Sequence, residues 1–260
     1  MPEKPNTTDE VCVVDRQGAV LIVTLNRPAQ RNALNSELRS RLRDAFDLLE
    51  EDDTLRCAVL TGAGTAFCAG GDMKEMAATS ATVPPEEWSR LLGSSGMVRK
   101  PVIAAVNGFA LAGGFRLVQQ CDLAIASEAA TFGITEVKRG RGAPWAAPLI
   151  DIVSKRMMME LLLTGQPITA QRAYEVGLVN RVVPAGSLLS EAVTMAQLIC
   201  ANAPLSVQAA KQLVEVSTEV GQTQAVRHAD AIYESVYRSE DAQEGPRAFA
   251  ERREPVWTGR

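Results

Sequence analysis

Histidine is almost missing from this 260-residue sequence, since His228 is the only one. A catalytic triad of serine, histidine and aspartate would have to use that residue, so histidine-based catalysis is disfavoured. The five cysteines form no CxxC pair and are odd in number, which favours reduced thiols over a disulfide framework. A cysteine-based zinc site is equally disfavoured, and we expect no bound metal.

Long apolar runs are missing too. Residues 1–10 are polar and lack the apolar centre of a signal peptide, and no run has the length of a membrane span. We therefore expect a cytoplasmic protein that contacts no membrane. The net charge of −4 gives no general attraction to nucleic acid, so a polyanionic ligand would need a local basic patch. Apolar residues make up 46% of the chain, which is typical of a globular protein that folds fully.

Short strand-like runs alternate with helical patterns as far as residue 183. The first two runs are separated by a turn-prone Arg-Gln-Gly and predict a hairpin. Residues 102–126 predict a strand, a helix and a second strand with a right-handed crossover, so the fold class is α/β. The predicted strands are residues 11–15, 19–25, 57–61, 102–106, 123–126 and 179–183. The predicted helices are residues 36–53, a short one after Asp72, 86–99, 112–120, 146–164, 169–176, 187–201, 204–220 and 223–237.

The last sixty residues show no strand-like run and are rich in alanine, valine and leucine. We divide the chain into an α/β core, residues 1–200, and an all-helical C-terminal region, residues 201–260. A helical extension of this kind usually packs against something, and we expect it to form a subunit interface and so to serve oligomerisation.

The loop at residues 62–71 follows a strand and begins with Gly-Ala-Gly, as a dinucleotide-binding turn does. Phe67 replaces the third glycine of that fingerprint, and no acidic residue follows at the required distance, so the fingerprint fails. Asp72 stands where the N-cap of the next helix belongs. Glu75, three residues later, is predicted to complete a capping box.

Two glycine-rich turns, residues 67–72 and 107–114, each lie between a strand and a helix N-terminus. The first turn of a helix has unpaired N–H donors and the positive end of the helix dipole, which suits a carbonyl oxygen that becomes negative. Glycine also serves tight turns and close packing, so spacing alone leaves a purely structural role open.

Sequence patterns around these turns resemble a known family. The matching segments are residues 26–34, 66–75, 107–126, 132–137, 173–183 and 240–257. Together they resemble the crotonase superfamily, the enoyl-CoA hydratase/isomerase family, over nearly the whole chain. The resemblance implies a crotonase-like spiral of ββα units, an acyl-coenzyme A substrate, and a homotrimer or dimer of trimers. It implies no cofactor apart from coenzyme A as part of the substrate.

The resemblance places two oxyanion-hole donors on the backbone N–H groups of Gly71 and Gly113. Two short N–H bonds to a thioester oxygen stabilise an enolate more than the ground state. Hydratases of the family commonly use two glutamates, at positions that here hold Arg116 and Glu136. An arginine cannot act as a general base, so proton transfer by Glu136 alone, as in double-bond isomerisation, fits better than hydration.

Arg116 is expected in the first helical turn, facing the oxyanion site. It can pair with Glu136 and lower the pKa of that carboxylate, bind a substrate carboxylate or carbonyl, or lie in a salt bridge along the helix surface. Trp145 and Arg141 are expected near the acyl pocket, where the indole would shorten the pocket or fill the core. Cys68 has no activating neighbour in the sequence, so a buried thiol is favoured over a nucleophile.

Five residues are predicted to contact coenzyme A on the strength of the resemblance. Arg31, Ala69 and Lys74 lie in or beside segments that match the family's nucleotide-contacting loops. Tyr233 and Arg252 match a C-terminal aromatic and a basic residue that often reach the nucleotide of a neighbouring subunit. We therefore predict an acyl-CoA enzyme; the alternative is a catalytically impaired acyl-CoA-binding protein of the same fold.

Overall fold

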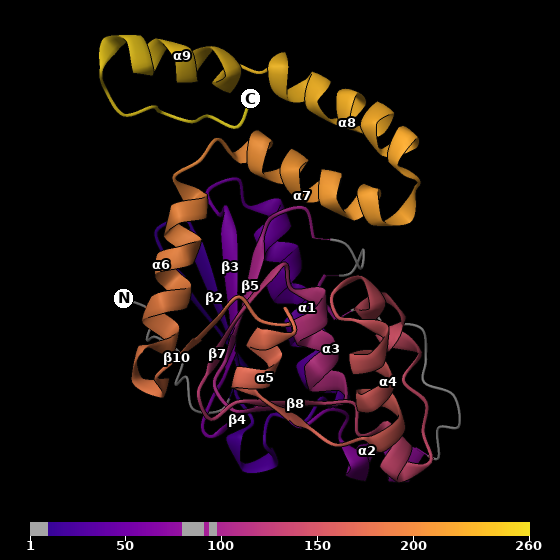
Figure 1. The fold of residues 1–260 in the computed structure, drawn as a ribbon. Helices are drawn as coiled ribbons and strands as arrows, with labels where there is room; N and C mark the ends of the chain where they lie inside the picture. The colour runs from indigo at the N-terminus through magenta and orange to yellow at the C-terminus, as the bar shows by residue number, and fades with distance from the viewer. Residues whose placement is uncertain (1–9, 80–90, 94–97) are drawn as a thin grey trace, which may run out of the picture.

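The computed structural model describes residues 10–79, 91–93 and 98–260. Figure 1 shows a core of strands with helices on both sides, and three C-terminal helices that extend beyond one end of it. The predicted α/β class is therefore confirmed. The helix predicted at residues 86–99 lies mostly outside the described residues.

The larger sheet has six strands in the order β1-β2-β3-β5-β7-β10. β1 and β2 form the predicted antiparallel hairpin, and the other strands run parallel to β2. Alternate residues of β3 enter two different cores, Ala58 and Leu60 on one face and Cys57 and Val59 on the other. Burial on both faces explains why the central strands β3, β5 and β7 are largely apolar. The strands are β1 (Cys12–Gln17), β2 (Val20–Leu25), β3 (Cys57–Gly62), β5 (Val102–Val106), β7 (Leu123–Ser127) and β10 (Arg181–Val183).

The smaller sheet has four short strands in the order β4-β6-β8-β9. β4, β6 and β8 run parallel, and each follows a strand of the larger sheet along the chain. A helix or helical turn comes next in each case, which makes three successive ββα units. The sequence did not predict this sheet, because strands of two or three residues show no alternating pattern. The strands are β4 (Ala66–Cys68), β6 (Phe109–Leu111), β8 (Thr131–Gly133) and β9 (Ile168–Thr169).

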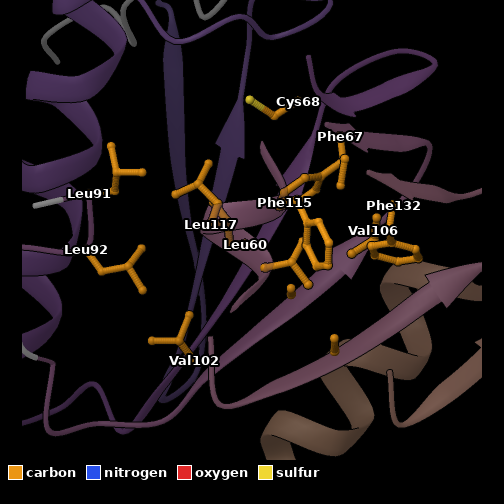
Figure 2. Close-up of a cluster of buried hydrophobic side chains, with 14 of the residues drawn as sticks. Leu60, Phe67, Cys68, Leu91, Leu92, Val102, Val106, Phe115, Leu117 and Phe132 are labelled. Atoms are coloured by element: carbon orange, nitrogen blue, oxygen red, sulfur yellow. The ribbon is translucent and has the colours of Figure 1, made fainter. Parts of the chain in front are cut away.

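The main core lies between the two sheets and the helices α1 (Ser36–Glu51) and α3 (Gly113–Gln120). Figure 2 shows Phe115 of α3 and Phe132 of β8 close together in this core, with ring centroids 6.0 Å apart in an edge-on arrangement. The opposite face of the larger sheet is covered by α6 (Leu188–Cys200), as Figure 1 shows. The apolar stripe predicted for α1 is buried, and it consists of Leu38, Leu42, Phe46 and Leu49.

The predicted capping box is wrong, although Asp72 does cap α2 (Met73–Thr79). Its Oδ1 accepts a hydrogen bond from the backbone N–H of Lys74 at 3.1 Å. The N–H of Asp72 already donates to the carbonyl of Leu34 at 3.1 Å, so it is not available to Glu75. The Glu75 carboxylate instead accepts from the N–H of Ser36, at 3.0 and 3.1 Å, and so caps the start of α1.

The helix predicted at residues 146–164 is divided in two. A 3-10 segment, η4 (Pro144–Asp151), contains Pro148, and a separate helix, α4 (Lys155–Thr164), begins after the cap Ser154. Proline lacks an N–H and clashes with the preceding turn, so it interrupts a continuous α-helix. The prediction at residues 169–176 is confirmed by α5 (Ala170–Glu175).

The C-terminal region holds α7 (Pro204–Glu219), α8 (Gln222–Tyr237) and α9 (Asp241–Glu251). The prediction that this region is helical throughout is wrong for residues 252–260, which fold back onto the core. Arg56 donates to the carbonyls of Cys200 at 3.2 Å and Trp257 at 2.9 Å. Division into a core and an oligomerisation region stays a prediction.

Within the described residues no single helix is long and apolar enough to cross a membrane, although α6 and α7, bent by 107°, meet that test as a pair.

Candidate active site

The segments that follow β4, β6 and β8 meet at one edge of the smaller sheet. Neighbouring parallel strands end at the same edge, and ligands of parallel sheets bind outside the carboxyl ends of the strands. A cavity of about 770 Å³ lies here. Its lining includes the four residues predicted to be catalytic, Gly71, Gly113, Arg116 and Glu136.

The two glycine turns touch each other at Gly70. This residue has a φ of 97°, a left-handed conformation that favours glycine. A Cβ atom there would lie only 2.8 Å from the Cβ of Ala112 and 3.2 Å from the nitrogen of Gly113. Glycine at position 70 therefore has a structural reason, because it lets the turn after β4 lie directly against the turn after β6.

The N–H groups of Gly71 and Gly113 both remain available to a ligand. A parallel bridge joins Leu34 to Gly71. Its two hydrogen bonds run from the N–H of Leu34 to the carbonyl of Gly70 and from the N–H of Asp72 to the carbonyl of Leu34, so the N–H of Gly71 takes part in neither. Gly113 is the first residue of α3, where a helix has no internal acceptor for the N–H. Among the described residues, neither N–H donates to a protein acceptor. A Cβ on Gly113 would lie 3.6 Å from the nitrogen of Gly71, so the two donors are neighbours.

Ala112, at the N-cap of α3, has a strained backbone with φ 51° and ψ −121°. Its N–H donates to the carbonyl of Gly133 at 2.9 Å, and its carbonyl accepts from the N–H of Arg116 at 3.0 Å. Such a conformation costs on the order of 1–3 kcal/mol and persists only where its surroundings hold it. Here the bonds on both sides of Ala112 set the direction of the N–H of Gly113.

Glu136 begins the helical turn η3 (Glu136–Arg139) and points one carboxylate oxygen to Trp145. The indole Nε1–H donates to Oε1 at 2.9 Å, whereas Oε2 is buried and has no hydrogen-bond partner among the described residues. Burial raises the pKa of Glu136, and the bond from Trp145 opposes this in part. An ion pair with Arg116, one of the roles left open for that arginine, would lower the pKa of Glu136, whereas the pKa is raised.

Two arginine side chains line the same cavity. Arg116 is half-buried on α3, and burial lowers its pKa. Arg39 of α1 is 6% exposed and donates from Nη2 to the carbonyl of Leu34 at 3.2 Å. The same Nη2 lies 3.7 Å from where a Cβ of Gly71 would be. Burial lowers the pKa of Arg39 to about 10, with Arg116 acting in the same direction and Glu75 against it.

The sequence predicted neither a place for Arg39 in the cavity nor the bond from Trp145 to Glu136. A signal for Arg39 exists, since residues 39, 42 and 46 share the helical spacing of a buried face. Trp145 was expected near the acyl pocket, and it lines the cavity with Arg141. Its ring packs edge-on against Phe115, with centroids 6.0 Å apart. Its bond to Glu136 joins two short 3-10 segments, η3 and η4, which show no periodic pattern in the sequence.

Only part of the predicted coenzyme A set reaches this cavity. Arg31 and Ala69 line it, and the N–H of Ala69 donates to the carbonyl of Arg31 at 3.0 Å. Lys74 is exposed on α2, Tyr233 lies on α8 and Arg252 ends α9. These three do not belong to the described lining of the cavity in this chain, so their contact with coenzyme A stays a prediction.

Neither Cys68 nor His228 has the surroundings of a catalytic group. Cys68 is buried, and its sulfur accepts from the N–H of Gly70 at 3.4 Å. Burial raises the pKa of Cys68 to about 12, which keeps the thiol neutral. His228 is exposed on α8, away from the residues that line the cavity. No group of three metal-binding side chains occurs in the part of the chain that the structure describes.

Comparison with known proteins decides the family. Residues 15–260 match the family described as Enoyl-CoA hydratase/isomerase. The chain belongs to this family. It is 41% identical to Enoyl-CoA hydratase EchA19 of Mycobacterium tuberculosis over 95% of this chain and 96% of that protein. It is 38% identical to 2,3-dehydroadipyl-CoA hydratase of Escherichia coli, over 95% and 98% of the two chains.

Solved structures of the enoyl-CoA hydratase/isomerase family share the fold. The crystal structure of enoyl-CoA hydratase from Mycobacterium tuberculosis H37Rv matches with a TM-score of 0.90 and 41% identity, covering 97% of this chain and all of that one. The predicted crotonase fold and the predicted family are therefore both confirmed. As a member of the family, the protein is an acyl-CoA enzyme of the lyase or isomerase type.

Proposed function

We propose that the protein binds an acyl-CoA thioester with its carbonyl oxygen between the N–H groups of Gly71 and Gly113, while Glu136 moves a proton at a nearby carbon. One observation carries this proposal. The two neighbouring N–H groups lack a protein acceptor among the described residues, and they share a cavity with a buried carboxylate oxygen of Glu136. The carbonyl oxygen of a thioester can accept from the two N–H groups, and the acidic C–H beside that carbonyl can give a proton to Glu136.

The two donors stabilise charge that appears only during the reaction. As a proton leaves the carbon beside the thioester, the carbonyl oxygen becomes an enolate oxygen. Gly113 presents its N–H at the positive end of the α3 dipole, and the strained Ala112 holds it in place before the substrate arrives. Loss of one such donor costs about 100- to 1000-fold in turnover.

Glu136 is suited to act as the base. A raised pKa brings a carboxylate closer to neutral pH and makes it a stronger proton acceptor. In a 3-enoyl thioester, Glu136 takes a proton from C2, and the electron pair moves to the carbonyl oxygen. The enolate then takes the proton back from Glu136 at C4. The double bond moves from C3–C4 to C2–C3, and no atom is gained or lost.

Isomerisation, or another reaction with one carboxylate, fits this site better than hydration. Among the described lining residues Glu136 is the only acid, and Arg116 holds the position of the second glutamate. A guanidinium stays protonated and so cannot activate a water. We therefore propose that Glu136 works alone.

The same proposal includes the contacts with coenzyme A and the oligomeric assembly predicted from the sequence. Arg31 and Ala69 would meet coenzyme A from this chain, while Lys74, Tyr233 and Arg252 would meet it from this chain or from a neighbouring subunit. A trimer or dimer of trimers would supply that neighbour. The exposed apolar side chains of the C-terminal helices, such as Val214 and Val226, support an interface there. Light scattering tests the assembly, and a monomer would overturn it.

A screen of 2-enoyl, 3-enoyl and 3-oxoacyl thioesters, followed by ultraviolet absorbance and mass spectrometry, tests the reaction. We expect a 3-enoyl thioester to gain the absorbance of a conjugated enoyl thioester at unchanged mass. Gain of water by a 2-enoyl thioester in the native protein would show hydration and refute the one-carboxylate reaction. Tight thioester binding without any turnover, unchanged by Glu136→Gln, would favour the impaired binding protein.

Arg116→Glu tests why hydration is disfavoured. This substitution supplies a second carboxylate to the cavity that Glu136 lines, so we expect the variant to add water to a 2-enoyl thioester that the native chain does not hydrate. The matched control is Arg116→Gln, which removes the same positive charge without adding a carboxylate. Hydration by the control as well would show that Arg116 does not decide the reaction through its lack of a base.

A further inference from the structure

Two of the five cysteines lie beside each other in the fold. Cys57 is the first residue of β3, and Cys200 is the last residue of α6, the helix that covers this face of the larger sheet (Figure 1). The carbonyl of Ala19 accepts from the N–H of Cys57 at 3.4 Å and from the Sγ of Cys200 at 3.8 Å. A hydrogen bond also joins the two thiol side chains. The fold therefore brings together two free thiols that are far apart in the sequence.

The other three cysteines have different surroundings. Among the described residues, the groups that act on Cys12, Cys68 and Cys121 include no other cysteine. Burial is the largest cause of the raised pKa of each of these thiols, and a raised pKa keeps a thiol neutral and slow to react. Chemistry between two thiols of one chain is therefore favoured at Cys57 and Cys200.

The two paired thiols differ in exposure and in acidity. Cys57 is fully buried, whereas Cys200 is partly exposed. The hydrogen bond between them and burial raise the pKa of Cys57, while the same hydrogen bond and the nearby Arg56 lower the pKa of Cys200. A donor or a cation beside a thiolate stabilises it, and accessible thiolates are the thiols that oxidants attack. Cys200 is therefore suited to react first, and Cys57 to react second from inside the core.

We infer that Cys57 and Cys200 form a reversible disulfide when a peroxide oxidises the protein. The thiolate of Cys200 attacks one oxygen of hydrogen peroxide, and the O–O bond breaks. A sulfenic acid forms on Cys200, and the hydroxide that leaves takes up a proton. The sulfur of Cys57 then attacks the sulfur of Cys200, the S–O bond breaks, and the hydroxyl leaves with the Cys57 proton as water. The two thiols lose two electrons in all, and one peroxide is reduced to two waters.

This disulfide would tie the core to the start of the C-terminal region. Residues 201–260 follow Cys200 directly, and Arg56 already donates to the carbonyls of Cys200 and Trp257 at this junction, at 3.2 and 2.9 Å. A bond between Cys57 and Cys200 closes a long loop, which restricts the unfolded chain and so stabilises the folded one. The inference does not depend on the proposed function, since neither cysteine belongs to the described lining of the cavity.

Oxidation of the native full chain tests the inference. The protein is treated with hydrogen peroxide, its remaining thiols are blocked with N-ethylmaleimide under denaturing conditions, and its peptides are mapped by mass spectrometry. We expect loss of two of the five thiols, a linked pair of peptides that contain Cys57 and Cys200, and a thermal midpoint higher by about 5 °C or more. Dithiothreitol should reverse all three changes. Linkage of other cysteines, further oxidation of Cys200 without linkage, or retention of all five thiols would overturn the inference.

Substitutions assign the order of the two steps. In Cys57→Ala we expect Cys200 to stop at the sulfenic acid, which dimedone labels, and in Cys200→Ala we expect Cys57 to stay reduced. Both variants should lose the thermal shift. The matched control is Cys121→Ala, a change at a cysteine of similar partial exposure, and it should keep both the linkage and the shift. Absence of the dimedone label on Cys200 in Cys57→Ala would contradict the inference. Cys57→Ser, which keeps the size of the side chain, repeats the test should Cys57→Ala fold poorly.

Discussion

The cavity has two walls that are built in different ways. The backbone wall consists of the turns at Gly71 and Gly113, which present main-chain N–H groups. The side-chain wall consists of Arg116, Glu136 and Trp145, which present a guanidinium, a carboxylate and an indole. The first wall is set by the path of the chain, whereas the second depends on which side chains occupy a few positions.

Because of this difference, the backbone wall is hard to alter by substitution and the side-chain wall is easy to alter. The backbone wall is held by contacts in the core, including the close approach of Gly70 to Ala112 and the bridge from Leu34. The side-chain wall can change by single substitutions that leave the turns intact. Under the proposed function, the backbone wall would keep stabilising an enolate while the side chains of the other wall decide the reaction.

Breaking the backbone wall should have the largest effect. Gly70→Ala puts a Cβ 2.8 Å from that of Ala112 at a φ of 97°, so both turns must move. Because each displaced donor costs about 100- to 1000-fold, we expect turnover to fall by about 10 000-fold or more when both move, and the free energy of unfolding to fall by about 1–3 kcal/mol. Steady-state kinetics and urea unfolding measure the two effects.

Gly186→Ala is the matched control for that substitution. A Cβ at Gly186 meets nothing within 4 Å, and the residue does not have a left-handed φ. We expect both turnover and stability to stay near native values. Native turnover in Gly70→Ala would show that the contact between the turns does not hold the two donors.

Removing Glu136, the proposed base, from the side-chain wall comes next in size. Glu136→Gln keeps the shape and an oxygen that can accept from Trp145, but it cannot take a proton. We expect turnover to fall about 100- to 10 000-fold while thioester binding stays close to native. Glu128→Gln, a change at an exposed glutamate outside the cavity lining, serves as the control. A loss of binding equal to the loss of turnover would contradict a role as base.

The pH dependence of kcat/KM sharpens the role of Glu136 further. The base must be ionised, so activity should rise with pH through a pKa above the ordinary glutamate value, because burial raises it. Trp145→Phe removes a hydrogen bond that favours the ionised carboxylate, which raises the pKa again. We expect the acid limb of the profile to move to higher pH by up to about one unit. A shift to lower pH would contradict this account.

The smallest effect is expected for Cys68, which lies behind the backbone wall. Its sulfur contributes one weak hydrogen bond from Gly70, and burial raises the thiol pKa to about 12. Cys68→Ala should keep turnover within about fivefold of native, and Cys68 of the native protein should react slowly with thiol reagents. A loss as large as that of Glu136→Gln would point to a nucleophilic thiol.

The sequence predicted the larger sheet and most helices well. Strands such as β3 and β5 are continuous apolar runs, and α1 shows a clear helical stripe. It did not predict the smaller sheet, whose strands of two or three residues form only when neighbouring units align them. Glu75 was predicted to cap its own helix, α2, but its carboxylate accepts from the N–H of Ser36 and so caps α1.

For the site, local pattern was enough to find the two glycine turns, Glu136 and the altered position Arg116, because each belongs to a recognisable segment. Only the tertiary structure decided what surrounds them. It brought Arg39 from α1 beside Gly71, gave Glu136 an indole partner, and raised the pKa of Glu136 by burial. A sequence pattern identifies a residue from its neighbours along the chain. The burial of that residue and the charges around it depend on groups that meet only when distant segments pack together.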